Sequence, residues 1–154
     1  MADRIDTRLA ELNLSLPGPH PPHNPLDAVV VHQGTARTSG QLPRVKGRLT
    51  CTGILGEGVS VEQGRQAAEV CALNALSVLR QALGSLDRVE RVLHVMGYVA
   101  SAPGFADQPA VMDGASNLLH AIFGEAGRHT RSAVGVAALP RGAPVEVELT
   151  VALR

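Results

Sequence analysis

Arg131 and Glu146 are the two residues whose types and positions could do chemistry on a small acid. Arg131 opens an apolar run at 132–137, and Glu146 lies near the start of another at 145–153. If these runs form paired strands, both side chains could line a pocket at one end of a sheet. A guanidinium can grip a carboxylate with two hydrogen bonds, and a glutamate can polarise a water molecule as a general base. Spacing alone favours the simpler interpretation, a surface or intersubunit ion pair.

Familiar catalytic and metal-binding motifs do not occur in the sequence. No glycine-rich segment has the spacing of a phosphate-binding or dinucleotide fingerprint. The six histidines form no HxH or HxxxH pair, and two cysteines are too few for a zinc site by themselves. We therefore expect no metal. No GxSxG segment marks a nucleophilic serine, although a Ser–His–Asp triad assembled by the fold stays open.

Composition limits the class of protein. A chain of 154 residues with 45% apolar residues fits one domain. Fourteen basic and fourteen acidic residues cancel, so the basic surplus typical of a nucleic-acid binder is missing. The N-terminus has no apolar signal segment and no run is long enough to cross a membrane, so we expect a cytoplasmic protein without membrane contact. The core, poor in aromatic residues, would gain from an apolar subunit interface.

The first 25 residues differ from the rest. Ile5, Leu9 and Leu12 have helical spacing, which predicts a short amphipathic helix over 3–14. Segment 15–25 holds five prolines and a glycine, so it is expected to be an extended connector. We expect an α+β domain to follow from 26 to 154.

Within that domain the first three elements precede a long helix. A hairpin is predicted over 28–31 and 35–39 with a Gln33-Gly34 turn, and a loop over 44–58 with a short strand around 49–52. The segment SVEQ forms a capping box in which Ser60 is the N-cap of a helix over 61–83. Cys71 lies on the apolar face of this helix and is expected to fill the core.

The second half alternates strand and helix. A strand over 88–101 is apolar on both faces, with Leu93 and Val95 on one and Val92 and His94 on the other. Asp107 is expected to cap a helix with a proline in its first turn, and strands follow at 132–137 and 145–153. This order predicts a mixed sheet with both long helices on one face. The other face would be apolar, and a second copy of the chain is the simplest cover.

Three segments resemble the Rid family, whose members are reactive-intermediate (enamine/imine) deaminases, also known as L-PSP endoribonucleases. They are SGQLP at 39–43, the helix over 61–83, and TRSAVGVAALPRGAPVEVELTVALR at 130–154. The resemblance covers roughly 26–154. It implies a trimeric chorismate-mutase-like fold, in which three sheets form a central barrel and pockets lie at the subunit interfaces.

The resemblance also implies an activity and a set of residues. Family members that are active hydrolyse 2-imino or 2-enamino acids to 2-oxo acids and ammonia without a metal or organic cofactor. By position, Arg131 matches the carboxylate-binding arginine and Glu146 the glutamate associated with the catalytic water. Ala133 matches the residue whose backbone faces the substrate, and Ser39-Gly40 matches the Ser-Gly of the SGQ motif.

The sequence also departs from the family. A tyrosine often found in a GPY segment is replaced by His20 in GPH, and the family's pocket asparagine falls on Asp113 or Ser116. Imine hydrolysis by a homotrimer, with a small carboxylate-bearing metabolite as substrate, is the leading hypothesis. A non-catalytic trimer that binds or senses a small carboxylate is the alternative. Ribonuclease activity is disfavoured by the neutral charge and the scarcity of aromatic residues.

Overall fold

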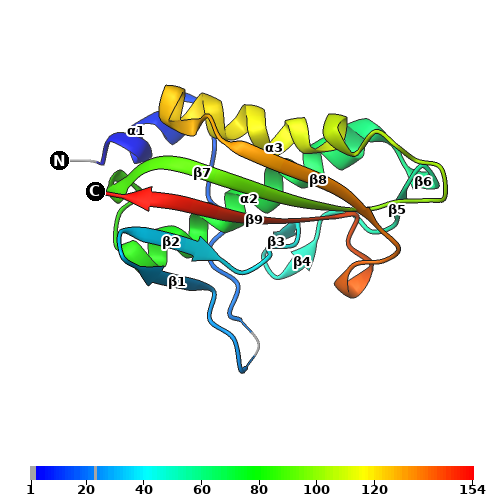
Figure 1. Ribbon diagram of the computed structural model, residues 1–154, viewed down its shortest axis with the longest axis horizontal. Coiled ribbons are helices and arrows are strands. Elements are labelled where there is room, and N and C mark those ends of the chain that lie inside the picture. Colours follow the sequence, from blue (N-terminus) through cyan, green and yellow to red (C-terminus); the bar gives the residue numbers. More distant parts are fainter. Residues whose placement is uncertain (1–2, 23) are drawn as a thin grey trace.

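The computed structural model describes residues 3–22 and 24–154, and its centre is one five-stranded sheet. The order of the strands is β1-β2-β9-β7-β8 (Figure 1). The bounds are β1 Val29–His32, β2 Thr35–Thr38, β7 Val89–Ala100, β8 Thr130–Val136 and β9 Val145–Leu153. All neighbours pair antiparallel except β7 and β8, which are parallel.

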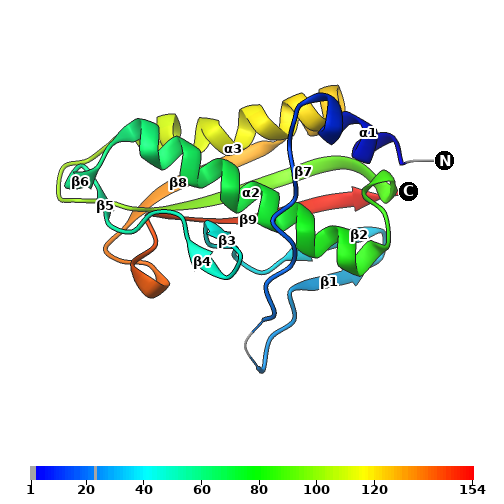
Figure 2. The same cartoon turned by 180° about the vertical axis from the view of Figure 1, so that it is seen from behind.

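Two long helices, α2 (Val61–Leu83) and α3 (Gln108–Phe123), lie side by side on one face of this sheet (Figure 2). Helix α3 connects β7 to β8, and a parallel pair needs such a crossover. The predicted mixed sheet with both helices on one face is therefore confirmed. Short 3₁₀ turns join the elements: η1 Leu86–Arg88, η2 Gly124–Gly127 and η3 Pro140–Gly142.

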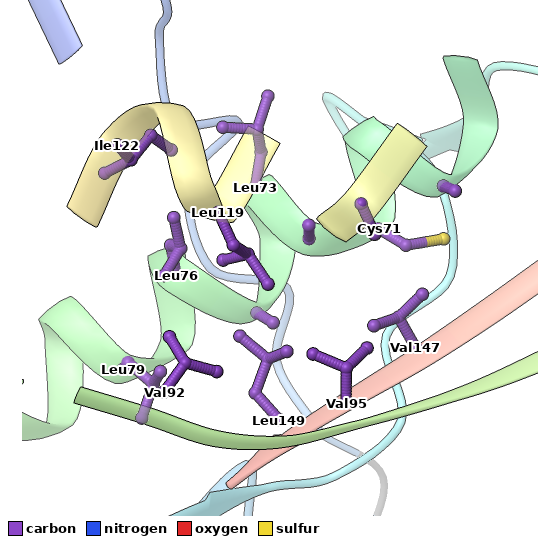
Figure 3. Close-up of a cluster of buried hydrophobic side chains, with 14 of the residues drawn as sticks. Cys71, Leu73, Leu76, Leu79, Val92, Val95, Leu119, Ile122, Val147 and Leu149 are labelled. Atoms are coloured by element: carbon purple, nitrogen blue, oxygen red, sulfur yellow. The ribbon is translucent and has the colours of Figure 1, made fainter. Parts of the chain in front are cut away.

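The core fills the space between these helices and the sheet. Leu76 of α2, Leu119 of α3, and Val95 and Leu149 of the sheet are fully buried and meet there (Figure 3). Each such side chain contributes about 1.5–3 kcal/mol through burial. Cys71 is also fully buried, and its thiol donates to the carbonyl of Val145 at 3.5 Å, so its predicted role as a core residue is confirmed.

Local sequence signals set the ends of α2 and the first turn as predicted. The Ser60 hydroxyl accepts from the N–H of Gln63 at 3.1 Å, and the Gln63 side chain accepts from the N–H of Ser60 at 2.9 Å. Gly84 follows the helix at a φ of 82°. Gln33 and Gly34 both have positive φ, as a tight hairpin turn between right-twisted strands requires.

Three details differ from the prediction. Val92 is buried under the helices while Leu93 is 38% exposed, because the register shifts between Val92 and His94 and reverses the alternation. The strand expected at 49–52 is replaced by a hairpin of β3 (Arg44–Val45) and β4 (Arg48–Leu49), followed by a parallel pair, β5 (Ile54–Leu55) and β6 (Gly58–Val59). Asp107 stands at the N-cap of α3 without a capping hydrogen bond from its side chain.

The face of the sheet opposite the helices, here called the open face, is mixed rather than apolar. Tyr98 donates its hydroxyl hydrogen to Glu148 at 2.7 Å, and Arg37 lies 3.9 Å from the same carboxylate. Exposed valines lie beside these polar groups: Val30 of β1 is 58% exposed and Val134 of β8 40%. The expectation of an apolar face is thus only partly right.

The N-terminal helix α1 (Arg4–Glu11) is part of the same core. Ile5 and Leu9 are buried, and the Asp87 carboxylate accepts from the N–H groups of Arg4 and Ile5 at 2.7 and 2.8 Å. The proline-rich connector then crosses α2 on its way to β1 (Figure 2). No helix within residues 3–22 and 24–154 has the length and apolar character that a membrane span requires.

Candidate functional site

Arg131 lies within edge strand β8 rather than before it, and its side chain points to the helix side of the sheet. Its Cα pairs with that of Val95, whose side chain is in the core under α2 and α3. The guanidinium Nη1 donates to Oδ1 of Asp113 at 2.9 Å and to Oγ of Ser116 at 3.1 Å. Only 22% of the Arg131 side chain is exposed, so α3 fixes its orientation.

Ser116 is at the same time bonded to a histidine. Its Oγ lies 2.9 Å from Nε2 of His129, and Nδ1 of that ring lies 2.6 Å from the Gly127 carbonyl oxygen. A carbonyl oxygen only accepts hydrogen bonds, so Nδ1 carries the hydrogen and the neutral ring accepts the Ser116 hydroxyl hydrogen at Nε2. Burial lowers the pKa of His129, and the positive charge of Arg131 lowers it further, while the hydrogen bond to the Gly127 carbonyl opposes both effects.

These residues border an open cavity of about 590 Å³ between the end of α3 and the start of β8. We call it the arginine cavity. Its lining is Ser116, Asn117, His120, Gly127, Arg128, His129 and Arg131. Its two guanidinium groups, those of Arg128 and Arg131, suit an anionic ligand.

Glu146 lies in a second cavity of about 250 Å³, here called the glutamate cavity. Ser39 and Gly40 line it beside Glu146, so three of the predicted site residues do come together within one chain. His20, which replaces the family's tyrosine, lines the same cavity, and so do Arg44 and Arg141, which the sequence analysis did not consider.

Gly40 matters because of the space it leaves. A Cβ built on Gly40 would collide with the Glu146 carboxyl group. The Ser39 hydroxyl donates to the Asp27 carbonyl at 2.6 Å, and Gln41 exchanges two backbone hydrogen bonds with Val147. The SGQ segment is therefore held against β9 so that the glutamate carboxylate rests on the glycine.

The environment of Glu146 favours its protonated form more than water does. Burial raises the pKa of Glu146, and the neighbouring charge of Glu148 raises it further, while Arg44 opposes both. A carboxylate with a raised pKa is a better proton acceptor once it is ionised.

Arg131 and Glu146 do not share a pocket within one chain. Strand β7 separates β8 from β9, so the pairing that would bring both side chains together is absent. Glu146 lies opposite Tyr98 on the open face, whereas Arg131 points to the helices. Ala133, two residues beyond Arg131, faces the same way and packs against the core.

Sequence reasoning missed His129 and left two alternatives for the asparagine position. The structure places both Asp113 and Ser116 on Arg131, one helical turn apart. His129 carries no motif, and only its position two residues before Arg131 could have drawn attention to it. Among the residues that the structure describes, no three His, Cys, Asp or Glu side chains are close enough to hold a metal ion.

A sheet covered by two helices on one face, with an arginine and a glutamate in separate cavities, defines an α+β protein of the chorismate-mutase-like class. Residues 7–151 match the family model described as "YjgF/chorismate_mutase-like, putative endoribonuclease". The chain therefore belongs to the YjgF/L-PSP family, which includes the Rid proteins, as the resemblance predicted.

Several relatives are similar over nearly their whole length. Protein TCP17 of Trypanosoma cruzi is 42% identical, with 97% of this chain and 94% of the relative covered. Atu1372 of Agrobacterium tumefaciens, a protein of unknown function with a crystal structure, is 39% identical and superposes with a TM-score of 0.90. The match covers 97% of this chain and 92% of Atu1372. E. coli TdcF, whose crystal structure contains bound serine, is 20% identical with a TM-score of 0.62. The match covers 91% of this chain and 95% of TdcF, so the two proteins share the fold.

Proposed function

We propose that the protein hydrolyses small 2-imino or 2-enamino acids to 2-oxo acids and ammonia at a site shared between copies of the chain. The observation that carries this proposal is the division of the site into two halves. A partly exposed guanidinium suited to a carboxylate lies on one side of the sheet, and a glutamate with a raised pKa lies on the other. Only contact between chains can bring these two halves together.

A homotrimer with a central barrel, as the family resemblance implies, would provide that contact. Strand β8 is an edge of the sheet, and Val134 on it presents an exposed apolar side chain on the open face. Exposed edge strands and apolar side chains gain from being covered. In this arrangement Arg131 of one copy faces Glu146, Ser39 and Gly40 of the next.

Each residue then has a task. Arg131 binds the substrate carboxylate, and the backbone at Ala133 lies beside the reacting carbon. Glu146 takes a proton from water as the water oxygen bonds to that carbon, and the imine nitrogen is protonated. The carbon–nitrogen bond then breaks, ammonia leaves, and the 2-oxo acid remains. The balance is one imine and one water to one 2-oxo acid and one ammonia, without a redox step.

The serine bound to E. coli TdcF supports the choice of ligand, since serine is a small acid of the same size class. Its carboxylate is a group to which a guanidinium can donate two parallel hydrogen bonds.

The test is to generate 2-imino acids with an amino-acid oxidase and to time the release of 2-oxo acid. Wild-type protein should accelerate the release, and Arg131→Ala should lose the acceleration. Arg80→Ala is the matched control, because Arg80 is an exposed arginine of α2 paired with Asp6. Equal rates for wild type and Arg131→Ala would refute the proposal. Tight 2-oxo acid binding without any turnover would instead select the alternative, a carboxylate-binding trimer.

A further inference from the structure

We propose that Ser116 is an activated nucleophile, with His129 as its base, and that the arginine cavity accepts small acyl esters that carry a second, anionic group. This acyl transfer is a separate activity and does not depend on imine hydrolysis.

The geometry of the serine and histidine supports the proposal. An activated nucleophile needs a base within hydrogen-bond reach and a third group that orients the base. Here the Ser116 hydroxyl is 2.9 Å from His129 Nε2, and the Gly127 carbonyl, 2.6 Å from Nδ1, fixes the ring and its tautomer. These are the roles that a serine, a histidine and a carboxylate have in hydrolases, with a backbone carbonyl in the third position.

The orienting carbonyl is itself held firmly. Gly127 is buried in η2, and a Cβ there would collide with the backbone of Leu119 and His120 in α3. The main chain at Gly127 thus lies directly on the helix that carries Ser116. This close backbone contact holds the Gly127 carbonyl, which accepts from the His129 ring, against α3.

Arg131 completes the arrangement from the other side of the hydroxyl. Its Nη1 donates to Ser116 Oγ at 3.1 Å, so it stabilises the negative charge that grows on this oxygen as the proton leaves. A hydroxyl oxygen has two lone pairs, and Arg131 occupies one of them, which leaves the other for attack. The electrostatics also fit, because burial and the nearby charge of Arg131 lower the pKa of His129 and so favour the neutral ring that can accept a proton.

The chemical class of the substrate follows from the lining. The cavity is lined by Arg128, Arg131, His120 and His129. Two carboxylates lie beside its guanidinium groups, that of Glu125 at 3.7 Å from Arg128 and that of Asp113 at 2.9 Å from Arg131. An acyl donor with its own carboxylate would be attracted to these basic groups, and its ester carbonyl would lie near Ser116. An uncharged ester of the same length would gain nothing from the guanidinium.

The reaction balances in two steps. Ser116 Oγ bonds to the acyl carbon while its proton moves to His129 Nε2, and the ester C–O bond breaks as the leaving alcohol takes that proton. Water then attacks the acyl-serine, gives one proton to His129, and the acid leaves as Ser116 recovers its hydrogen from the ring. No oxidant, reductant or metal takes part.

The experiment uses the whole chain and two p-nitrophenyl esters, the glutarate monoester with a free carboxylate and the uncharged valerate. We expect a burst of p-nitrophenolate with the glutarate ester, and peptide mapping should place one glutaryl group on Ser116. Acylation of Ser116 by the glutarate ester should be about tenfold or more faster than acylation by the valerate ester. Arg131→Gln should remove this preference. His129→Gln should slow acylation by about 100-fold or more.

Matched controls separate this site from general reactivity. Ser132→Ala changes an exposed serine of β8, and His32→Gln changes an exposed histidine of β1; both should behave as wild type. The absence of an adduct on wild-type Ser116, an adduct at another residue, or an unchanged rate in His129→Gln would each overturn the proposal. The wild-type adduct map decides the matter even if Ser116→Ala fails to fold. If the protein fails to hydrolyse imines but still forms the adduct on Ser116, the proposed function is refuted and the acyl-transfer proposal stands.

Discussion

The carboxylate of Asp113 lies 2.9 Å from the guanidinium of Arg131, so the arginine expected to bind a substrate acid already binds an acid of its own chain. A ligand carboxylate must displace Asp113 or share the guanidinium with it. The Asp113 side chain is 47% exposed, so it can swing out into solvent.

Asp113→Asn should therefore strengthen the binding of a 2-oxo acid such as pyruvate. This partly exposed ion pair is worth about 1 kcal/mol, and removing the Asp113 carboxylate as a competitor should lower the Kd by roughly fivefold. Isothermal titration at low salt measures the change. Asp3→Asn, at the N-cap of α1, is the control and should leave the Kd as it is. Weaker binding by Asp113→Asn would mean that Asp113 helps to hold the ligand.

Gly40→Ala should reduce imine hydrolysis, because the new methyl group meets the Glu146 carboxyl and pushes it away. A displacement of a catalytic group of this kind costs about 100-fold in rate. A double-mutant cycle on kcat/KM tests whether Gly40 acts through Glu146. In a Glu146→Ala background, Gly40→Ala should have little further effect. Additive losses would show that Gly40 acts through another group.

Glu146→Gln should stabilise the protein at neutral pH. The pKa of Glu146 is raised in the folded state above its ordinary value of 4.5, which the unfolded chain keeps. At any pH between the unfolded-state pKa and the folded-state pKa, the folded chain therefore binds more protons than the unfolded chain. The stability of the wild type therefore falls, relative to Glu146→Gln, as the pH rises through this window. Thermal unfolding from pH 4 to pH 8 checks this, and the difference should vanish below about pH 4.5. Glu90→Gln, which changes an exposed glutamate of β7, is the control and should not alter the pH dependence of stability in this way.

Mixing two strongly impaired variants tests whether the site is shared between chains. Arg131→Ala and Glu146→Ala each retain the half of the site that the other lacks. If they are unfolded together and refolded as mixed trimers, about one quarter of the sites should contain both wild-type residues. Activity per site should return to about that fraction of wild type. A mixture that stays inactive although mass spectrometry shows mixed oligomers would place the whole site within one chain.

The elements with strong local signals were predictable from the sequence. The last strand, Val145–Leu153, and helix α2 with its cap at Ser60 have the bounds that their alternation and capping residues predict. The predictions were wrong where contacts between distant parts of the chain determine the local structure. Nothing near Val92 marks the bulge that turns Leu93 outward, because the bulge depends on the pairing of β7 with β9.

The candidate site shows the same division. Ser39, Gly40 and Glu146 could be grouped through the family resemblance, and they do line one cavity. The separation of Arg131 from Glu146 depends on β7 entering between β8 and β9, and on the register that places Arg131 opposite the buried Val95. No local pattern shows either feature. The hydrogen bond between Ser116 and His129 likewise joins a helix to the segment just before β8, 13 residues apart, and neither residue has a motif around it.

The proline-rich connector reaches the glutamate cavity, where Pro21 and Pro22 form part of the wall. A proline ring has a fixed backbone φ and almost no side-chain freedom to lose, so this wall deforms little when a molecule enters. We expect the connector to select ligands by their width. It would admit slender acids and exclude branched or aromatic ones sterically, whatever their charge.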